Sequence, residues 1–320
     1  TLQFQFETST SPFRTKIRSI KQLDKLLINK KYLTPNMTLQ LLLSFAQQAN
    51  YSTLSVQEPF YVVGDIHGSY VDLSNLLSQI GVENLFRNKT IVFVGDYTDR
   101  GQQGVEVLQM VLYLHMLKAN VVLLRGNHEN KRVNIRYGFF NESNTKLTPD
   151  FFENFSDFYQ RLPIIAIVNN YFICHGGAPV AHDSLSFSDE FVRDILWSDP
   201  RNQSQITASR RGAGKNYGSD QNLEFLLRNG FKAVIRGHEA VTHLRDDFGD
   251  GRHYTVFSAS FYSDDISNNI GFFAEITQDC VKQIQIIPNN KKEKQINTFI
   301  LVELISSTLI MVSYLISHFV

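Results

Sequence analysis

The sequence predicts an α/β fold in which parallel strands are covered by helices, and three observations support this. Apolar runs rich in Val, Ile, Leu and Phe occupy residues 60–63, 91–94 and 121–124, with the length and composition of buried strands. Apolar stripes at helical spacing separate them, over residues 73–80 and 107–114. Two strand–helix–strand units in succession favour parallel strands joined by crossover helices. A glycine follows each strand within two residues, and polar side chains gather around it.

The composition permits one large hydrophobic core. Of the 320 residues, 43% are hydrophobic and 19% are charged, and this length allows one or two domains. Lys plus Arg and Asp plus Glu balance at 31 each, so the chain lacks the basic excess expected of a protein that binds nucleic acid non-specifically. Cys174 and Cys280 form no metal-ligand spacing and are too few for a disulfide scaffold, which favours a reducing compartment.

At the amino end we expect a loose leader over residues 1–18 and no signal peptide, since no charged start is followed by an apolar stretch. Ile20, Leu23 and Leu27 fall at helical spacing, and a second helix is predicted to begin after Pro35. We expect these two helices to cap the core rather than to form a separate domain.

The catalytic domain, predicted over residues 19–288, continues with strands and fewer helices. Strands are expected at residues 164–168 and 171–174, joined by a tight turn at Asn169-Asn170, and at residues 233–235, 255–257 and 272–276. Residues 141–150 and 199–220 are polar and are expected to be loops. No break between domains is expected before residue 288.

After a polar linker over residues 289–298, residues 299–320 are mostly Leu, Ile, Val and Phe. As a helix, this stretch is long enough to cross a hydrocarbon core of about 30 Å. Lys291, Lys292 and Lys294 stand just before it. We expect a C-terminal apolar helix that anchors a cytoplasmic catalytic domain to a membrane. The alternative is a helix that docks on the catalytic domain or on a regulatory subunit.

The strand ends supply candidate ligands for metal ions. Acids, histidines and an amide stand beside a glycine or one residue from one, where the backbone can turn sharply. In chain order they are Asp65, His67, Asp96, Asp99, Asn127, His128, His175 and His238. Carboxylate, imidazole and amide ligands without thiolates suit first-row divalent ions such as Mn, Fe or Zn.

These residues can be divided between two ions. One ion would be held by Asp65, His67 and Asp96, and a second by Asn127, His175 and His238, with Asp96 shared as the bridge. Two ions about 3.5–4 Å apart would lower the pKa of a shared water and make a hydroxide nucleophile at neutral pH. Such a centre would hydrolyse a phosphate ester without a covalent enzyme intermediate.

Further residues would handle the phosphate and the leaving group. Arg100 and Arg211 carry guanidinium groups, which bind phosphate oxygens through a bidentate fork and keep their charge. His128 could protonate the departing alkoxide, and Asp99 would hydrogen-bond its imidazole.

Each polar residue taken alone has a structural alternative. A histidine after a strand is usually a satisfied loop residue. Arg125 and Arg236 could pair with carboxylates at the rim of the site, and Glu129 and Glu239 could be structural acids. The eight strand-end residues together argue against that reading, because all stand at the same end of successive strands.

Five motifs resemble, in order and in spacing, the signature of the phosphoprotein phosphatase family of serine/threonine phosphatases. They are Gly64-Asp65-Ile66-His67-Gly68, Gly95-Asp96-Tyr97-Thr98-Asp99-Arg100-Gly101, Gly126-Asn127-His128-Glu129, His175-Gly176-Gly177 and Arg236-Gly237-His238. Leu196-Trp197-Ser198-Asp199-Pro200 and Arg211-Gly212 resemble later landmarks of the same family. The likeness runs from residue 19 to residue 288.

The resemblance implies a core of two facing mixed β-sheets flanked by helices, with a dinuclear metal centre that hydrolyses phosphoserine and phosphothreonine in proteins. The family's metal ligands fall on the six residues divided above between two ions. Its general acid and orienting acid fall on His128 and Asp99, and its phosphate contacts on Arg100, Asn127 and Arg211. Tyr262 matches a tyrosine on the loop that overhangs the family's site. The expected partners are phosphoprotein substrates and regulatory subunits.

Within the family, residues 125–139 and the Ser258-Ala259-Ser260 start of the overhanging loop are more similar to the branch with EF-hands than to protein phosphatase 1 or 2A. No Asp-x-Asp-x-Asp-Gly calcium loop follows. Ser263 stands where the commoner Ser-Ala-Pro-Asn-Tyr-Cys form of the loop has cysteine. We therefore predict that thiol-reactive toxins are not captured covalently there.

Two other functions are compatible with parts of the sequence. A related metallophosphoesterase acting on small phosphate esters or dinucleoside polyphosphates would share the first two motifs, but residues 196–200 and Tyr262 favour a protein phosphatase. An inactive membrane-tethered scaffold is disfavoured because every expected metal ligand is present.

Overall fold

The chain divides into one compact unit over Thr1–Ile286 and a second unit over Ile287–Val320. The computed structural model describes residues 12–45, 51–185, 187–262 and 269–288. The expected linker over residues 289–298 and the expected apolar helix over residues 299–320 lie outside these ranges. In the described part of the chain, no helix is both long enough and apolar enough to span a membrane.

Two helices begin the described chain. α1 (Pro12–Leu27) starts inside the segment expected to be a loose leader, so residues 12–18 are helical. Proline suits the first turn of a helix, because an N–H donor has no partner there. Ile20 and Leu23 are buried in the core. α2 (Pro35–Ser44) begins at Pro35 as predicted.

The first sheet has five strands in the order β14-β13-β2-β3-β4. Its strands are β2 (Phe60–Val63), β3 (Ile91–Phe93), β4 (Val121–Leu123), β13 (Phe272–Ile276) and β14 (Val281–Gln285). The neighbours β2, β3 and β4 are parallel, as predicted, and α3 (Tyr70–Ile80) and α4 (Gly104–Met116) lie in the connections between them. A short 3₁₀ helix, η1 (Val82–Phe86), follows α3.

The second sheet has six strands in the order β1-β5-β6-β10-β12-β11. They are β1 (Tyr51–Leu54), β5 (Ile165–Val168), β6 (Tyr171–Cys174), β10 (Ala233–Arg236), β11 (Arg245–Asp246) and β12 (His253–Thr255). β5 and β6 form the predicted hairpin, in which Asn169 and Asn170 have φ of 48° and 66°. Positive φ at both central residues is what a tight hairpin turn of this kind requires.

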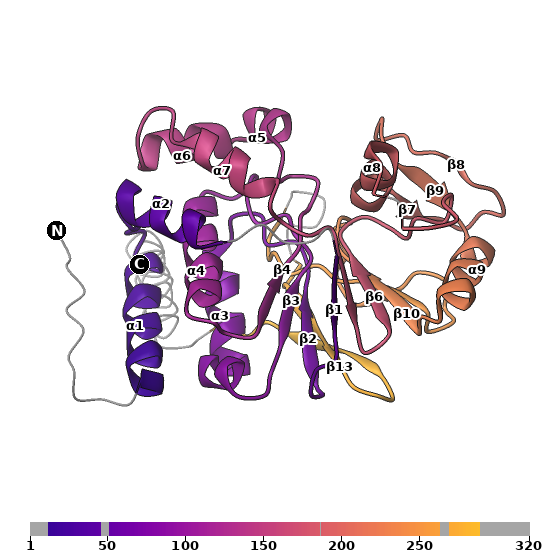
Figure 1. The fold of residues 1–320 in the computed structure, drawn as a ribbon, viewed down its shortest axis with the longest axis horizontal. Helices are drawn as coiled ribbons and strands as arrows, with labels where there is room; N and C mark the ends of the chain where they lie inside the picture. Colours follow the sequence, from indigo (N-terminus) through magenta and orange to yellow (C-terminus); the bar gives the residue numbers. More distant parts are fainter. Residues whose placement is uncertain (1–11, 46–50, 186, 263–268, 289–320) are drawn as a thin grey trace, which may run out of the picture. The chain divides into compact units, whose positions relative to one another are not determined.

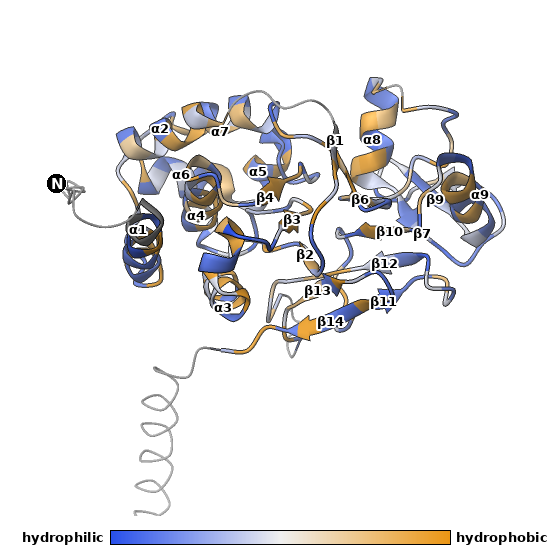
Figure 2. Cartoon of the chain, turned by 60° about the horizontal axis from the view of Figure 1, so that its bottom comes forward, coloured by the Kyte–Doolittle hydropathy of each residue, from blue (hydrophilic) through white to orange (hydrophobic). Residues whose placement is uncertain are grey.

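The two sheets pack face to face, with helices on both outer sides (Figure 1). Phe60 and Val62 of β2 belong to the core between the sheets, together with Ile173 of β6 and Ile235 of β10. Val63, on the other face of β2, packs under α1, α3 and α4. Side chains alternate between the faces of a strand, so one short run serves both cores. The central strands are coloured as hydrophobic in Figure 2. The predicted architecture of two facing mixed sheets is confirmed.

Residues 141–150 are largely helical, so the prediction of a loop there was wrong. α5 (Lys131–Tyr137), α6 (Phe139–Lys146) and α7 (Phe152–Tyr159) follow one another in this region. Phe139 at the start of α6 packs edge-on against Phe155 of α7, with ring centroids 5.2 Å apart. Burial of these rings stabilises helices whose exposed residues are polar and would not be predicted to be helical from composition.

Residues 199–220 also contain more regular structure than expected. β7 (Asp199–Pro200), β8 (Thr207–Ala208) and β9 (Lys215–Tyr217) form a small three-stranded sheet. It lies between α8 (Asp189–Trp197) and α9 (Ser219–Asn229) along the chain. Both helices contribute buried residues to the core on the outer face of the six-stranded sheet.

Replacing Phe155 by alanine is expected to lower the free energy of unfolding by about 3–5 kcal/mol, because this ring is fully buried and its loss leaves a cavity. Urea denaturation followed by circular dichroism measures the change. Leu227→Ala is the matched control, since Leu227 is 74% exposed on α9 and should change the free energy by less than about 0.5 kcal/mol. Equal losses in the two variants would contradict the packing of α7 against α6.

Candidate dinuclear metal centre

The six residues predicted to bind metal come together where the two sheets meet. Asp65, Asp96 and Asn127 follow strands of the five-stranded sheet, and His175 and His238 follow strands of the six-stranded sheet. All six, including His67, are buried. Because the strands concerned run parallel within each sheet, their carboxyl ends reach a common edge.

One cluster joins both sheets. Oδ1 of Asn127 lies 2.8 Å from Nε2 of His175 and 3.1 Å from Nδ1 of His238. Nε2 of His175 also lies 3.3 Å from Oδ1 of Asp96. Four potential ligand atoms therefore face one small volume.

The other cluster lies on the five-stranded sheet. Nε2 of His67 is 3.7 Å from Oδ2 of Asp65 and 3.6 Å from Oδ2 of Asp96. Among the described residues, two groups have ligand atoms that all lie within 4.8 Å of one another: one is His67, Asp96 and His128, and the other is Asp96, His175 and His238. Asp96 belongs to both groups and presents a different oxygen to each.

Backbone carbonyls orient two of the histidine rings. Nδ1 of His67 lies 3.0 Å from the Thr98 carbonyl oxygen, and Nδ1 of His175 lies 3.1 Å from the Val94 carbonyl oxygen. An N–H at Nδ1 leaves the lone pair of Nε2 directed into the cluster, which is how proteins orient histidine ligands. Nε2 of His238 is buried and has no hydrogen-bond partner among the described residues.

The electrostatics of the site fit divalent cations. Burial raises the pKa of Asp65 and of Asp96, and the neighbouring Asp65 carboxylate raises that of Asp96 further. Burial lowers the pKa of His67, His175 and His238, which keeps these imidazoles neutral and able to bind metal. Buried carboxylates surrounded by neutral imidazoles form a donor set suited to divalent metal ions.

The backbone is strained at the site. His67, Asp96 and His238 have φ of 46°, 53° and 70°, and Asp99 and Arg100 both have φ of 68°. Residues other than glycine rarely adopt positive φ, and such strain is usually retained at functional sites. At each of these positions a sharp turn aims the side chain toward the edge shared by the two sheets.

Glu129 holds the turn that carries Asp96, a role that the sequence left open between function and structure. Its carboxylate accepts hydrogen bonds from the backbone N–H groups of Asp96 at 2.8 Å, Tyr97 at 3.1 Å and Gly126 at 2.7 Å. Glu129 is fully buried. Its place directly after Asn127-His128 was the available signal, but the three backbone partners could be identified only in the folded chain.

His128 and Asp99, the predicted acid and orienting acid, are in contact. Nδ1 of His128 lies 2.7 Å from Oδ2 of Asp99. Asp99 also accepts hydrogen bonds from the side chain of Asn134 at 2.7 Å and from the backbone N–H of Phe139 at 2.9 Å. Asn134, on α5, was missed because a single asparagine in a polar helix carries no sequence signal.

Arg100 and Tyr262 lie beside these clusters. The guanidinium carbon of Arg100 is 4.0 Å from the ring centroid of Tyr137 and 5.9 Å from that of Tyr262. The Tyr262 ring stacks on His67 with centroids 4.9 Å apart, and burial raises the pKa of its hydroxyl to about 12. Tyr137 was not predicted. Ser263, where no toxin capture is expected, lies outside the described residues.

Arg211 is bound to a carboxylate. Its Nε and Nη2 atoms donate to the two oxygens of Asp199 at 2.6 and 3.3 Å. Asp199 also accepts from Nη2 of Arg236 at 3.0 Å, and Nη1 of Arg236 donates to Glu239 at 2.9 Å. Arg236 is completely buried, so it does pair with carboxylates but in the interior and not at the rim.

Comparisons with known proteins agree with this geometry. The model of the calcineurin-like phosphoesterase family matches residues 58–242. A probable serine/threonine-protein phosphatase of Encephalitozoon cuniculi is 36% identical over 217 residues, which are 63% of this chain and 47% of the relative. A catalytic chain of protein phosphatase 2A from Dictyostelium discoideum is 31% identical over 290 residues, which are 85% of this chain and 88% of the relative.

A solved structure has the same fold. The Saccharomyces cerevisiae protein serine/threonine phosphatase with similarity to human phosphatase PP5 matches with a TM-score of 0.75 at 26% identity, covering 86% of this chain and 98% of that one. The chain spans less than half the length of some curated relatives that it matches. The chain belongs to the calcineurin-like phosphoesterases and, within them, to the phosphoprotein phosphatase family of serine/threonine phosphatases.

Proposed function

We propose that this protein hydrolyses phosphoserine and phosphothreonine residues in proteins. The observation that carries the proposal is the position of Asp96: Oδ2 lies 3.6 Å from Nε2 of His67, and Oδ1 lies 3.3 Å from Nε2 of His175. A carboxylate so placed can bridge two metal ions, the arrangement that phosphate-ester hydrolysis uses. Membership of a family of protein phosphatases supports phosphoproteins as the substrate class.

The residues would share two divalent ions as the sequence predicts. Asp65, His67 and Asp96 would hold one ion, and Asn127, His175 and His238 would hold the other, with Asp96 common to both. The chemistry of these ligands suits Mn, Fe or Zn. When bound, the ions supply Lewis-acid activation of water and neutralise charge on the phosphoryl group.

The phosphate would be bound by Arg100, Asn127 and Arg211, with Tyr262 at its edge. Asn127 directs Oδ1 into the cluster of His175 and His238, which leaves its amide N–H groups for a phosphate oxygen. Arg211 uses Nε and Nη2 on Asp199, so Nη1 is the atom that would reach the phosphate.

His128 would protonate the departing serine or threonine oxygen. Its Nδ1 is engaged by Asp99, so the proton to be transferred is at Nε2. Asp99 holds the ring in position and stabilises the imidazolium form, and Asn134 and Phe139 hold Asp99 in turn.

The decisive experiment is a manganese-dependent assay of wild type and Asp65→Asn on phosphoserine peptides and on diadenosine polyphosphates. Hydrolysis of the peptides by wild type and its loss in Asp65→Asn would support the proposal. Preferential turnover of the diadenosine polyphosphates would instead identify a phosphoesterase of small molecules. A wild-type protein that turns over neither substrate would contradict both activities.

Asp96→Asn is expected to lower kcat/KM on phosphoserine peptides by more than about 100-fold, because even residues that only support a metal ligand cost 10–100-fold when replaced. Arg100→Ala should cost less, since it removes one of several phosphate contacts. Bound manganese, measured by elemental analysis, should fall in Asp96→Asn and stay unchanged in Arg100→Ala. An Arg100→Ala enzyme that is weaker than Asp96→Asn would be evidence against a bridging Asp96.

His128→Asn should slow hydrolysis of phosphoserine peptides by about 10²–10⁴-fold, the usual contribution of a general acid. The same change should affect p-nitrophenyl phosphate much less, because p-nitrophenolate leaves without a proton. His182→Asn is the matched control, since Nε2 of His182 pairs with Asp194 at 2.9 Å outside the site. If His128→Asn slowed both substrates equally, His128 would not be the acid.

From the sequence alone we further propose that residues 299–320 tether a cytoplasmic catalytic domain to a membrane. Deletion of residues 297–320 should then move the protein from the membrane fraction to the soluble fraction of a detergent-free lysate. A full-length chain found entirely in the soluble fraction would rule out the tether and favour docking on a regulatory subunit.

A further inference from the structure

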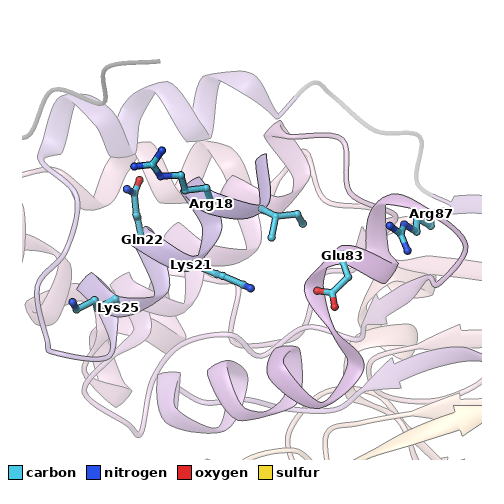
Figure 3. A pocket seen from close by; sticks show the side chains of 7 residues that line it. Arg18, Lys21, Gln22, Lys25, Glu83 and Arg87 are labelled. Carbon is cyan, nitrogen blue, oxygen red and sulfur yellow. The ribbon is translucent and has the colours of Figure 1, made fainter. Parts of the chain in front are cut away.

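A second candidate binding site lies on α1, outside the metal centre. A groove with a volume of about 650 Å³ is lined on one side by Arg18, Lys21 and Lys25 of α1. Arg87, directly after η1, lines the other side (Figure 3). We propose that this groove binds an acidic, extended segment of a partner protein.

The charge of the groove is the first reason. Among the described residues that line it, Glu83 is the one acid against four cations, and all of these side chains are exposed. Within the described part of the chain, neither Lys21 nor Lys25 forms an ion pair. Since Lys plus Arg and Asp plus Glu balance at 31 each in the whole chain, this positive charge is local. A hollow lined by one sign of charge attracts ligands of the opposite sign.

The spacing of the cations favours an extended peptide. Arg18, Lys21 and Lys25 stand at positions i, i+3 and i+7 of one helix, which span about 10 Å at 1.5 Å per residue. An extended chain covers that distance in about three residue steps, and its alternate side chains, about 6.6 Å apart, point the same way. The two lysines are separated by about 6 Å along the helix. Ile17 adds a partly buried apolar surface to the lining.

The groove is already formed in the folded chain. The ammonium group of Lys16 donates to the Leu117 carbonyl oxygen at 2.8 Å, which ties α1 to the end of α4. The hydroxyl of Tyr70 on α3 donates to Asp24 of α1 at 2.8 Å. Figure 2 shows α1 as mostly hydrophilic in colour. A preformed groove binds an extended segment without the cost of reorganising its own walls.

The chain's own segments do not match the groove in charge. Residues 1–11 contain one acid, and residues 289–320 contain two, Glu293 and Glu303, well apart. The lysines Lys291, Lys292 and Lys294 would be repelled. An acidic run must therefore come from another protein.

The test measures binding of a fluorescein-labelled peptide of alternating Asp and Glu to the full chain, by fluorescence anisotropy. Lys21→Glu combined with Lys25→Glu should weaken binding by at least about tenfold, since each reversal replaces an attraction by a repulsion. Affinity should also fall with added salt. The control combines Arg193→Glu on α8 with Lys282→Glu on β14, which changes the net charge equally elsewhere.

Support requires that the control variant binds like wild type and that the Asn/Gln version of the peptide does not bind. Hydrolysis of p-nitrophenyl phosphate and the thermal unfolding temperature should be unchanged in all variants, which separates the groove from the metal centre and from folding. No binding of the acidic peptide, equal weakening in the control variant, or association of the groove only with phosphatidylserine vesicles would overturn the proposal.

Discussion

The site depends on holding together carboxylates that repel one another. Asp65, Asp96 and Glu129 are all buried, and burial raises the pKa of each. Backbone N–H groups oppose this effect: the N–H of His238 donates to Asp65 and that of His128 donates to Asp96, both at 2.9 Å. Each carboxylate is thus held by an amide from a different strand end. Displacing one strand end would leave a buried charge unsatisfied, so the four ends must be positioned together.

Those strand ends belong to two sheets, and neither sheet contains the site alone. The hydrogen bond from His238 to Asp65 crosses from one sheet to the other. Nearby, the backbone N–H of Gly64 donates to the Ser258 hydroxyl at 2.9 Å, and the N–H of Ser258 donates to the Asp65 carbonyl at 3.1 Å. The core between the sheets sets their separation, because close-packed side chains resist compression. The ligand positions are therefore a consequence of how the two sheets pack.

The sequence was most informative where chemistry and local geometry coincide. Asp65, Asp96 and His238 stand next to glycines at strand ends, so both their position and their residue type were visible. Asn134 and Tyr137 were missed because each acts through a residue that is distant in the chain: Asn134 bonds Asp99, and Tyr137 stacks on Arg100. The helices around residues 139–155 were missed because burial of aromatic rings, rather than helix propensity, stabilises them. Patterns within a short window cannot reveal such tertiary contacts.

Arg236 gives the site a connection that no single motif suggests. Its guanidinium is fully buried and bonds both Asp199 and Glu239, while Asp199 also holds Arg211. A buried charge is tolerated only when its partners satisfy it, so Asp199 cannot shift without cost. Arg236 is also two residues before His238, whose ring belongs to one of the clusters around Asp96. The same buried arginine thus fixes a metal-binding strand end and, through Asp199, the guanidinium of Arg211. The two parts of the site should consequently be built, and lost, together.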